Sequence, residues 1–182
     1  EISQLLRGQF GTEAAMAATT GAGATFVLLD AAVVRVPMTL STLHLPFNWR
    51  YGAANRNIGD ASYAVTQHAF KGVGLRPLSP AHLAGVRNGV GDLQLSWKRR
   101  TRIGGDSWDA AEVPLSEDAE LYEVDVMAGA TVKRTLTAAT PGVTYTAAQQ
   151  IADFGSTQSS IAVRVYQLGA TFGRGAMRAA TL

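Results

Sequence analysis

The stretch Asp92–Lys98, with the sequence DLQLSWK, decides the fold class. Its apolar residues Leu93, Leu95 and Trp97 alternate with polar residues, and side chains that alternate in this way point to opposite faces of a β-strand. The spacing therefore predicts a strand with one buried face, on which Trp97 anchors the core.

Further short runs in the C-terminal part repeat this pattern and are separated by Gly, Pro or polar residues. Many short strands with turn signals between them are typical of an antiparallel β-sandwich, and residues 76–182 match the ~100 residues of an immunoglobulin-like sandwich. The predicted strands after Trp97 are Tyr122–Met127, Val132–Thr137, Thr144–Ala147 and Ile161–Tyr166.

Residues 1–75 are expected to form a small β-rich domain with one short helix, joined to residues 76–182 by a linker. The linker is indicated by Lys71–Pro80, in which two prolines favour extended backbone. Thr12–Ala18 is short and Ala-rich and predicts one or two helical turns with Thr12 as the N-cap. Extended segments are expected at Glu1–Arg7, Phe26–Leu29, Ala32–Val36, Pro46–Tyr51 and Ser62–Phe70, with a polar loop over Gly52–Asp60.

Two of these runs predict a hairpin. Phe26–Leu29 and Ala32–Val36 are apolar and only Asp30 and Ala31 separate them, which is the spacing of a tight turn. Pro37 then confines the second run to the edge or the end of a sheet.

The composition is that of a folded protein. Of the 182 residues, 47% are hydrophobic and 16% are charged, so the chain can bury a core. No apolar run reaches the ~18 residues of a membrane span, and no basic-then-apolar leader is visible, so we expect neither a span nor a signal peptide. A net charge of +2 gives no indication of nucleic-acid binding. The absence of Cys excludes disulfides and Cys-based zinc sites.

The most unusual local feature is the 98–125 segment, in which Lys98, Arg99, Arg100 and Arg102 precede eight acidic residues between Asp106 and Asp125. One interpretation is a recognition loop that offers arginines and an aromatic ring to a glycan or a neighbouring subunit. The other is that the basic and acidic runs neutralise each other within one folded loop. The candidate contact residues of the first interpretation are Arg99, Arg100, Arg102, Asp106 and Trp108.

Catalytic, metal and cofactor motifs give no candidates. The sequence has neither a GxSxG elbow nor a P-loop, the three His are scattered, and the acids near Trp108 lack the spacing of an EF-hand. We therefore expect no enzyme, no cofactor and no metal site.

Four strings resemble a fibronectin type III module: Arg76–Leu83 (RPLSPAHL), Asp92–Trp97 (DLQLSW), Tyr122–Val126 (YEVDV) and Ile161–Val165 (IAVRV). The resemblance implies a proline-containing first strand, a second strand that bears Trp97 and a third that bears Tyr122.

A second resemblance covers nearly the whole chain. The strings that carry it are LLRGQFGTE (5–13), FVLLD (26–30), GLRPLSP (74–80), WKRRTR (97–102), GDSW (105–108) and ADFG (152–155). Together they are similar to the C-terminal part of the host-specificity protein of gene transfer agents, a family related to tail-tip and baseplate proteins of tailed phages.

This resemblance implies a virion protein at the tail tip of a phage-like particle, made in the bacterial cytoplasm. Its partners would be other tail-tip or baseplate proteins and two further copies in a homotrimer, and its role would be tail assembly and attachment to the host surface. The alternatives are a carbohydrate-binding sandwich that grips host polysaccharide and, from another class, a glycan-cleaving fragment.

Overall fold

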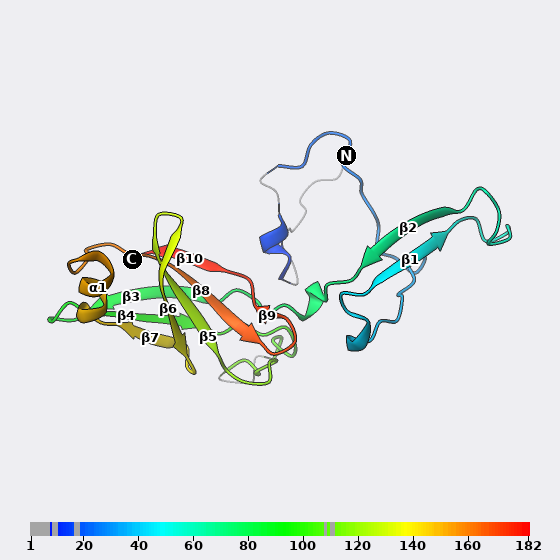
Figure 1. Ribbon diagram of the computed structural model, residues 1–182. Coiled ribbons are helices and arrows are strands. Elements are labelled where there is room, and N and C mark those ends of the chain that lie inside the picture. Colours follow the sequence, from blue (N-terminus) through cyan, green and yellow to red (C-terminus); the bar gives the residue numbers. More distant parts are fainter. Residues whose placement is uncertain (1–7, 9–10, 17–18, 108, 110–111) are drawn as a thin grey trace. The chain divides into compact units, whose positions relative to one another are not determined.

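The computed structural model describes residues 8, 11–16, 19–107, 109 and 112–182 (Figure 1). Contacts divide the chain into two units, one of which is Thr19–Gly74 and the other Leu75–Leu182 with the described part of Glu1–Ala18. The bounds 1–75 and 76–182 stay a prediction.

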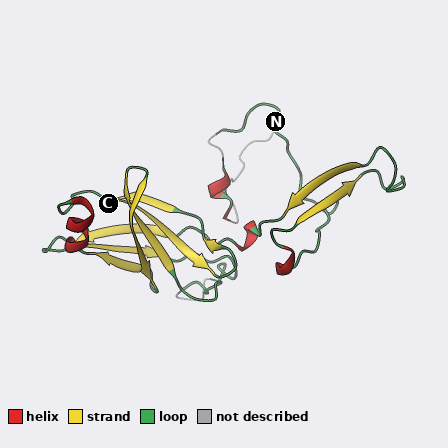
Figure 2. Ribbon diagram, viewed as in Figure 1, coloured by secondary structure: helices red, strands yellow, loops and turns green. Residues whose placement is uncertain are grey.

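The fold is mainly β, as predicted, and its sheets are antiparallel (Figure 2). Thr19–Gly74 contains β1 (Pro46–Tyr51) and β2 (Ala64–Ala69). The other unit contains β3 (Ala81–Arg87), β4 (Leu93–Lys98), β5 (Tyr122–Ala128), β6 (Thr131–Ala138), β7 (Gly142–Tyr145), α1 (Ala147–Phe154), β8 (Ala162–Gly169), β9 (Gly173–Arg174) and β10 (Arg178–Thr181).

The strands from β3 onward form a sandwich of two sheets. One sheet has the order β3-β4-β7, and the other has the order β10-β8-β5-β6 with β9 added to β8. This division, with the first, second and fifth strands in one sheet and the third, fourth and sixth in the other, is fibronectin type III-like.

The core lies between the two sheets and is built from the predicted alternation. Leu93, Leu95 and Trp97 are 1%, 3% and 3% exposed, while the residues between them on β4 are exposed. Tyr122 comes from the opposite sheet, and its ring meets that of Trp97 edge to face with 5.1 Å between the centroids. Leu93, Leu95 and Trp97 therefore point inward, as expected.

The predicted hairpin over Phe26–Val36 is wrong. This segment contains no strand, and only a turn at Asp30 remains, where the Val33 N–H donates to the Asp30 carbonyl over 3.1 Å. Leu29 and Val34 are 80% and 84% exposed. A strand pair needs a face to bury, and within Thr19–Gly74 no described sheet covers these side chains.

The predicted strands Pro46–Tyr51 and Ser62–Phe70 are confirmed as β1 and β2, which pair with each other. Within the described part of the predicted helix, residues 12–16, the structure has one 3-10 turn, Glu13–Ala15, and Thr12 precedes it without a side-chain cap hydrogen bond. Residues 17 and 18 of this prediction lie outside the described residues. The extended segment expected at Glu1–Arg7 lies outside the described residues.

The predicted strand Thr144–Ala147 is only half right, because β7 ends at Tyr145 and α1 begins at Ala147. The Thr146 side chain accepts from the Gln149 N–H, the Gln149 side chain accepts from the Thr146 N–H, and Gly155 ends the helix at φ 84°. These capping residues were readable in the sequence as a T-x-x-Q box followed by a glycine.

Candidate functional site

The segment between β4 and β5 holds the residues that the sequence singled out, and it begins with Arg99. The Arg99 Nη1 lies 2.8 Å from a Glu120 carboxylate oxygen, and its Nη2 donates to the Val113 carbonyl over 2.6 Å. Glu120 also accepts from the Tyr122 hydroxyl over 2.8 Å. The Arg99 side chain is only 14% exposed, and its contacts connect the end of β4 to Val113 and Glu120 later in the same segment.

Arg102 is engaged in the same manner. Its Nε donates to Glu117 over 2.8 Å, its Nη2 donates to the Ser116 carbonyl over 3.1 Å, and its backbone N–H donates to the Ser116 hydroxyl over 3.2 Å. The Arg102 and Glu117 side chains are 15% and 6% exposed. The loop therefore folds on its own opposite charges at these two arginines.

Arg100 takes a different partner. Its Nη1 bonds to Glu13, from the 3-10 turn, and lies 3.3 Å from the Ser79 hydroxyl. Burial acts to raise the pKa of Glu13, but the hydrogen bond and charge of Arg100 outweigh it and hold that pKa below its usual value. Arg100 thus ties the segment near the N-terminus to the sandwich.

The structure therefore does not bring the candidate contact residues together around one point. Arg99, Arg100 and Arg102 each turn to a separate carboxylate. Asp106 is exposed, and Trp108 lies outside the described residues. A contact of this segment with a ligand or a subunit stays a prediction.

A second polar cluster, which the sequence analysis missed, covers the outer face of the larger sheet. Arg174 of β9 donates to both Asp125 oxygens over 2.6 and 3.0 Å, bonds to Glu123, and places its guanidinium 4.6 Å from the centre of the Tyr166 ring. The Thr135 hydroxyl donates to Asp125 over 2.7 Å. The alternation of acids with valines along β5 was the available sequence signal.

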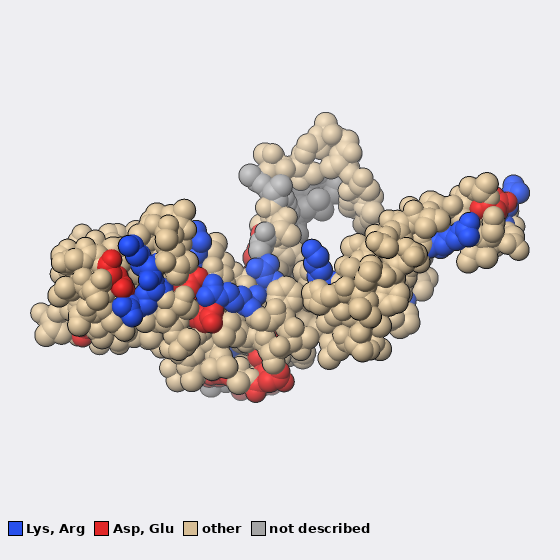
Figure 3. Space-filling model, in the orientation of Figure 1, with Lys and Arg blue, Asp and Glu red and all other residues tan. Residues whose placement is uncertain are grey.

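Asp125 is ionised within this cluster although it is only 2% exposed. Burial acts to raise the pKa of Asp125, but hydrogen bonds from Arg174 and Thr135 and the charges of Arg174 and Arg164 hold it below its ordinary value. Figure 3 shows Lys and Arg beside Asp and Glu on the face of the sandwich in view.

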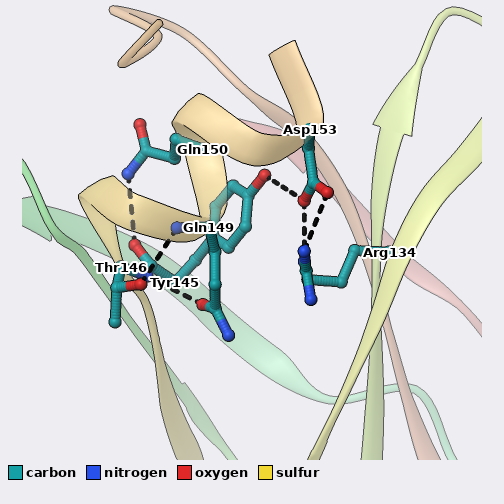
Figure 4. Close-up of polar contacts among 6 residues, drawn as sticks. All are labelled: Arg134, Tyr145, Thr146, Gln149, Gln150 and Asp153. Atoms are coloured by element: carbon teal, nitrogen blue, oxygen red, sulfur yellow. Dashed lines mark hydrogen bonds and ion pairs between the residues drawn. The ribbon is translucent and has the colours of Figure 1, made fainter. Parts of the chain in front are cut away.

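A third cluster joins α1 to both sheets (Figure 4). Asp153 accepts from the Arg134 Nε and Nη2 over 2.7 and 2.8 Å, and from the Tyr145 hydroxyl over 2.7 Å. Hydrogen bonds from Arg134, and then the one from Tyr145, lower the pKa of Asp153. Burial and the hydrogen bond to Asp153 raise the pKa of Tyr145. This geometry holds the helix on the sandwich.

An open cavity of about 470 Å³ lies where β5 begins and β8 ends. Leu121 and Leu168 line it together with Ala119 and Ala170, and Asp118, Glu123 and Arg174 stand around it. Such a cavity admits one side chain or a small ligand.

Two further features concern ions and membranes. Among the residues that the structure describes, no three His, Asp or Glu side chains gather as a metal site would require. None of the helices in the described ranges has the length and apolar character needed to span a membrane.

No protein-family model matches the sequence, and no curated protein matches it. Solved structures with some similarity include domains d3–d4 of the rat CD45 extracellular region, at 10% identity and a TM-score of 0.42, over 92% of this chain and 79% of that one. Another, described as a myokine structure, has 10% identity and a TM-score of 0.36 over 58% of this chain and 95% of its own. The FN5 domain of Drosophila Lar has 13% identity and a TM-score of 0.34 over 58% and 94%.

Proposed function

We propose that the chain is a structural component of the tail tip or baseplate of a phage-like particle, such as a gene transfer agent. There it takes part in tail assembly and in attachment to the host surface, without catalysis. Its partners are other tail-tip proteins and further copies of itself in a homotrimer. The sequence resemblance supplies the kind of particle, and the surface of Thr19–Gly74 supports a role in assembly.

The exposed apolar surface of Thr19–Gly74 is the observation that carries this proposal. Not one residue of this unit is buried, although it is rich in Val, Leu and aromatic residues. Its only sheet is the two-stranded ribbon of β1 and β2, and an isolated two-stranded ribbon is marginally stable in water. Apolar and aromatic residues of this unit that are each more than 60% exposed include Phe26, Val27, Leu28, Leu29, Val34, Leu40, Tyr51, Ile58 and Val65.

An apolar surface of this extent is characteristic of an interaction site. Covering it removes apolar area from water, at a gain of about 25 cal/mol per Å². A subunit of a large assembly meets that need, because its neighbours supply the missing cover.

The sandwich supplies a different property. Its two sheets enclose one apolar core, and arginines fasten the loop between β4 and β5 and the α1 helix to it. A framework fixed in this way holds its loops in constant positions, which suits a spacer or display unit at a surface.

The experiment that tests the proposal is electron microscopy of the intact particle with the chain located by its fitted density. We expect the density at the distal end of the tail, with protein packed against Thr19–Gly74. Density in the head, or absence of the chain from the particle, would overturn the proposal.

A pair of variants tests the assembly surface itself. Leu29→Asp combined with Val34→Asp places two charges on the exposed apolar surface and is expected to lower incorporation into particles. Val90→Asp is the control, because Val90 is 74% exposed in the turn between β3 and β4. Equal incorporation of all three proteins would contradict the assembly role of Thr19–Gly74.

A glycan array distinguishes the carbohydrate-binding alternative from the structural role. Binding of host polysaccharide that is lost in Trp108→Ala would favour the alternative. An array without signal for either protein leaves the structural role.

A further inference from the structure

The open cavity beside β5 and β8 has a shape and a chemistry that the proposed function does not use. Its lining comes from residues around the start of β5, from the end of β8 and from β9. Figure 1 shows how the chain leaves β8, turns and forms β9. Gly169, at the end of β8, has no room for a side chain, because an added Cβ would stand 2.5 Å from Glu117 and 3.0 Å from Pro77. The end of β8 therefore packs closely against Glu117 and Pro77 beside the cavity.

The floor of the cavity is aliphatic. Leu121 is 43% exposed, Leu168 is half-buried, and alanines stand beside both. An apolar side chain that enters removes leucine surface from water, so the floor favours a ligand with an aliphatic group.

The rim of the cavity carries more negative than positive charge. The Arg174 guanidinium is already bonded to Asp125 and Glu123, so the carboxylates of the sheet neutralise its positive charge. Asp118 is exposed, and no residue in the described parts of the chain pairs with it. The Glu123 side chain is 26% exposed and bonds to Arg174 through one of its two carboxylate oxygens. The rim therefore has more carboxylates than cations, which favours a ligand that carries a positively charged group.

We propose that this cavity receives an aliphatic side chain from a segment of a partner protein, with a neighbouring lysine or arginine of that segment placed on Asp118 and Glu123. A neutral glycan fits less well, because sugars stack on aromatic rings and the described lining has none. The proposal is independent of the particle to which the chain belongs.

The test uses the whole 182-residue chain labelled with ¹⁵N and two blocked peptides, acetyl-Leu-Lys-Leu-amide and acetyl-Leu-Gln-Leu-amide. The lysine peptide is expected to shift the amide signals of Leu121, Leu168 and Gly173, and to bind more tightly than the glutamine peptide. The difference is expected to shrink in high salt, because screening weakens exposed charge pairs.

Variants locate the binding site. Asp118→Asn is expected to weaken the lysine peptide about two- to fivefold and to leave the glutamine peptide unchanged, which is the range of an exposed ion pair. Asp109→Asn, which makes the same change of charge outside the cavity lining, is the control and is expected to change neither. In the absence of peptide, amide shifts in β5 and β8 that match those of the native chain show that each variant is folded.

Three results would overturn the proposal. They are equal affinity of the two peptides for the native chain, peptide-induced shifts confined to residues outside the cavity, and shifts at the cavity with maltohexaose but with neither peptide. Absence of the chain from a tail tip would leave the cavity proposal intact, so the two proposals fail separately.

Discussion

Trp97 and Tyr122 join the two sheets of the sandwich through an edge-to-face ring contact, with 5.1 Å between centroids and 69° between planes. Trp97 stands on β4 in the smaller sheet and Tyr122 begins β5 in the larger one. Between them runs the segment that carries Arg99 and Arg102, both of which bond to acids just before β5. The ring contact therefore closes the base of that segment.

Loss of the Trp97 ring is expected to destabilise the sandwich strongly. Trp97→Ala leaves a cavity between the sheets and should lower the free energy of unfolding by about 3–5 kcal/mol. The measurement is hydrogen exchange of the buried Val124 and Val165 amides with denaturant. Trp49→Ala, on β1 in the other unit, is the control and should leave that exchange unchanged.

The glycine that ends α1 is expected to resist substitution. Gly155 has φ 84°, where a Cβ costs about 1–2 kcal/mol, so Gly155→Ala should lower the unfolding free energy by about that amount. Gly89→Ala is the matched control, because Gly89 lacks a positive φ and has open space around its Cα. Equal stability of the two variants in thermal unfolding would contradict this account.

Removal of Arg174 should lower the stability of the fold, because it leaves the buried Asp125 carboxylate without its ion-pair partner. Arg174→Leu is expected to lower stability by about 1–2 kcal/mol, less than for a fully buried pair because the Arg174 side chain is 41% exposed. Arg178→Leu serves as the control, since no ion pair of Arg178 occurs within the described ranges. If both variants unfolded at the same urea concentration, Asp125 would not depend on Arg174.

Asp125 also predicts a dependence of stability on pH. Its pKa in the folded chain lies below the ordinary value of 3.8, so its ionised form stabilises the fold above that pH. The contribution is lost as the pH falls below about 4, because the unfolded chain takes up the proton first. Urea unfolding between pH 7 and pH 2 should show a smaller decline for Asp125→Asn than for the native chain.

The Tyr145 hydroxyl is expected to hold α1 in place. Tyr145→Phe removes the bond to Asp153 but keeps the ring, and should cost about 1 kcal/mol. Exchange of the α1 amides should accelerate more than exchange in β4. Uniform acceleration across the sandwich would show that the hydroxyl stabilises the whole core rather than the helix.

The period-2 pattern around Leu93, Leu95 and Trp97 determined the strands and the inward face, because a strand alternates its side chains whatever its partner. The two apolar runs within Phe26–Val36, which predicted a hairpin, were misleading, since apolar residues form strands only where a neighbouring surface covers them, and Thr19–Gly74 does not cover them. Thr146 and Gly155 carry the cap signals of the α1 helix, but the strand predicted over Thr144–Ala147 did not take them into account.

Only the tertiary structure decided which charges meet. Arg100 and Glu13 are 87 residues apart in the chain, and Arg174 and Asp125 are 49 apart, so no local pattern links them. The cavity beside Leu121 and Leu168 arises in the same way, from β5, β8 and the turn before β9. The sequence determines which residues of a strand lie on its apolar face, because this depends on local alternation alone. An ion pair or a cavity between distant segments exists only once the sheets have packed.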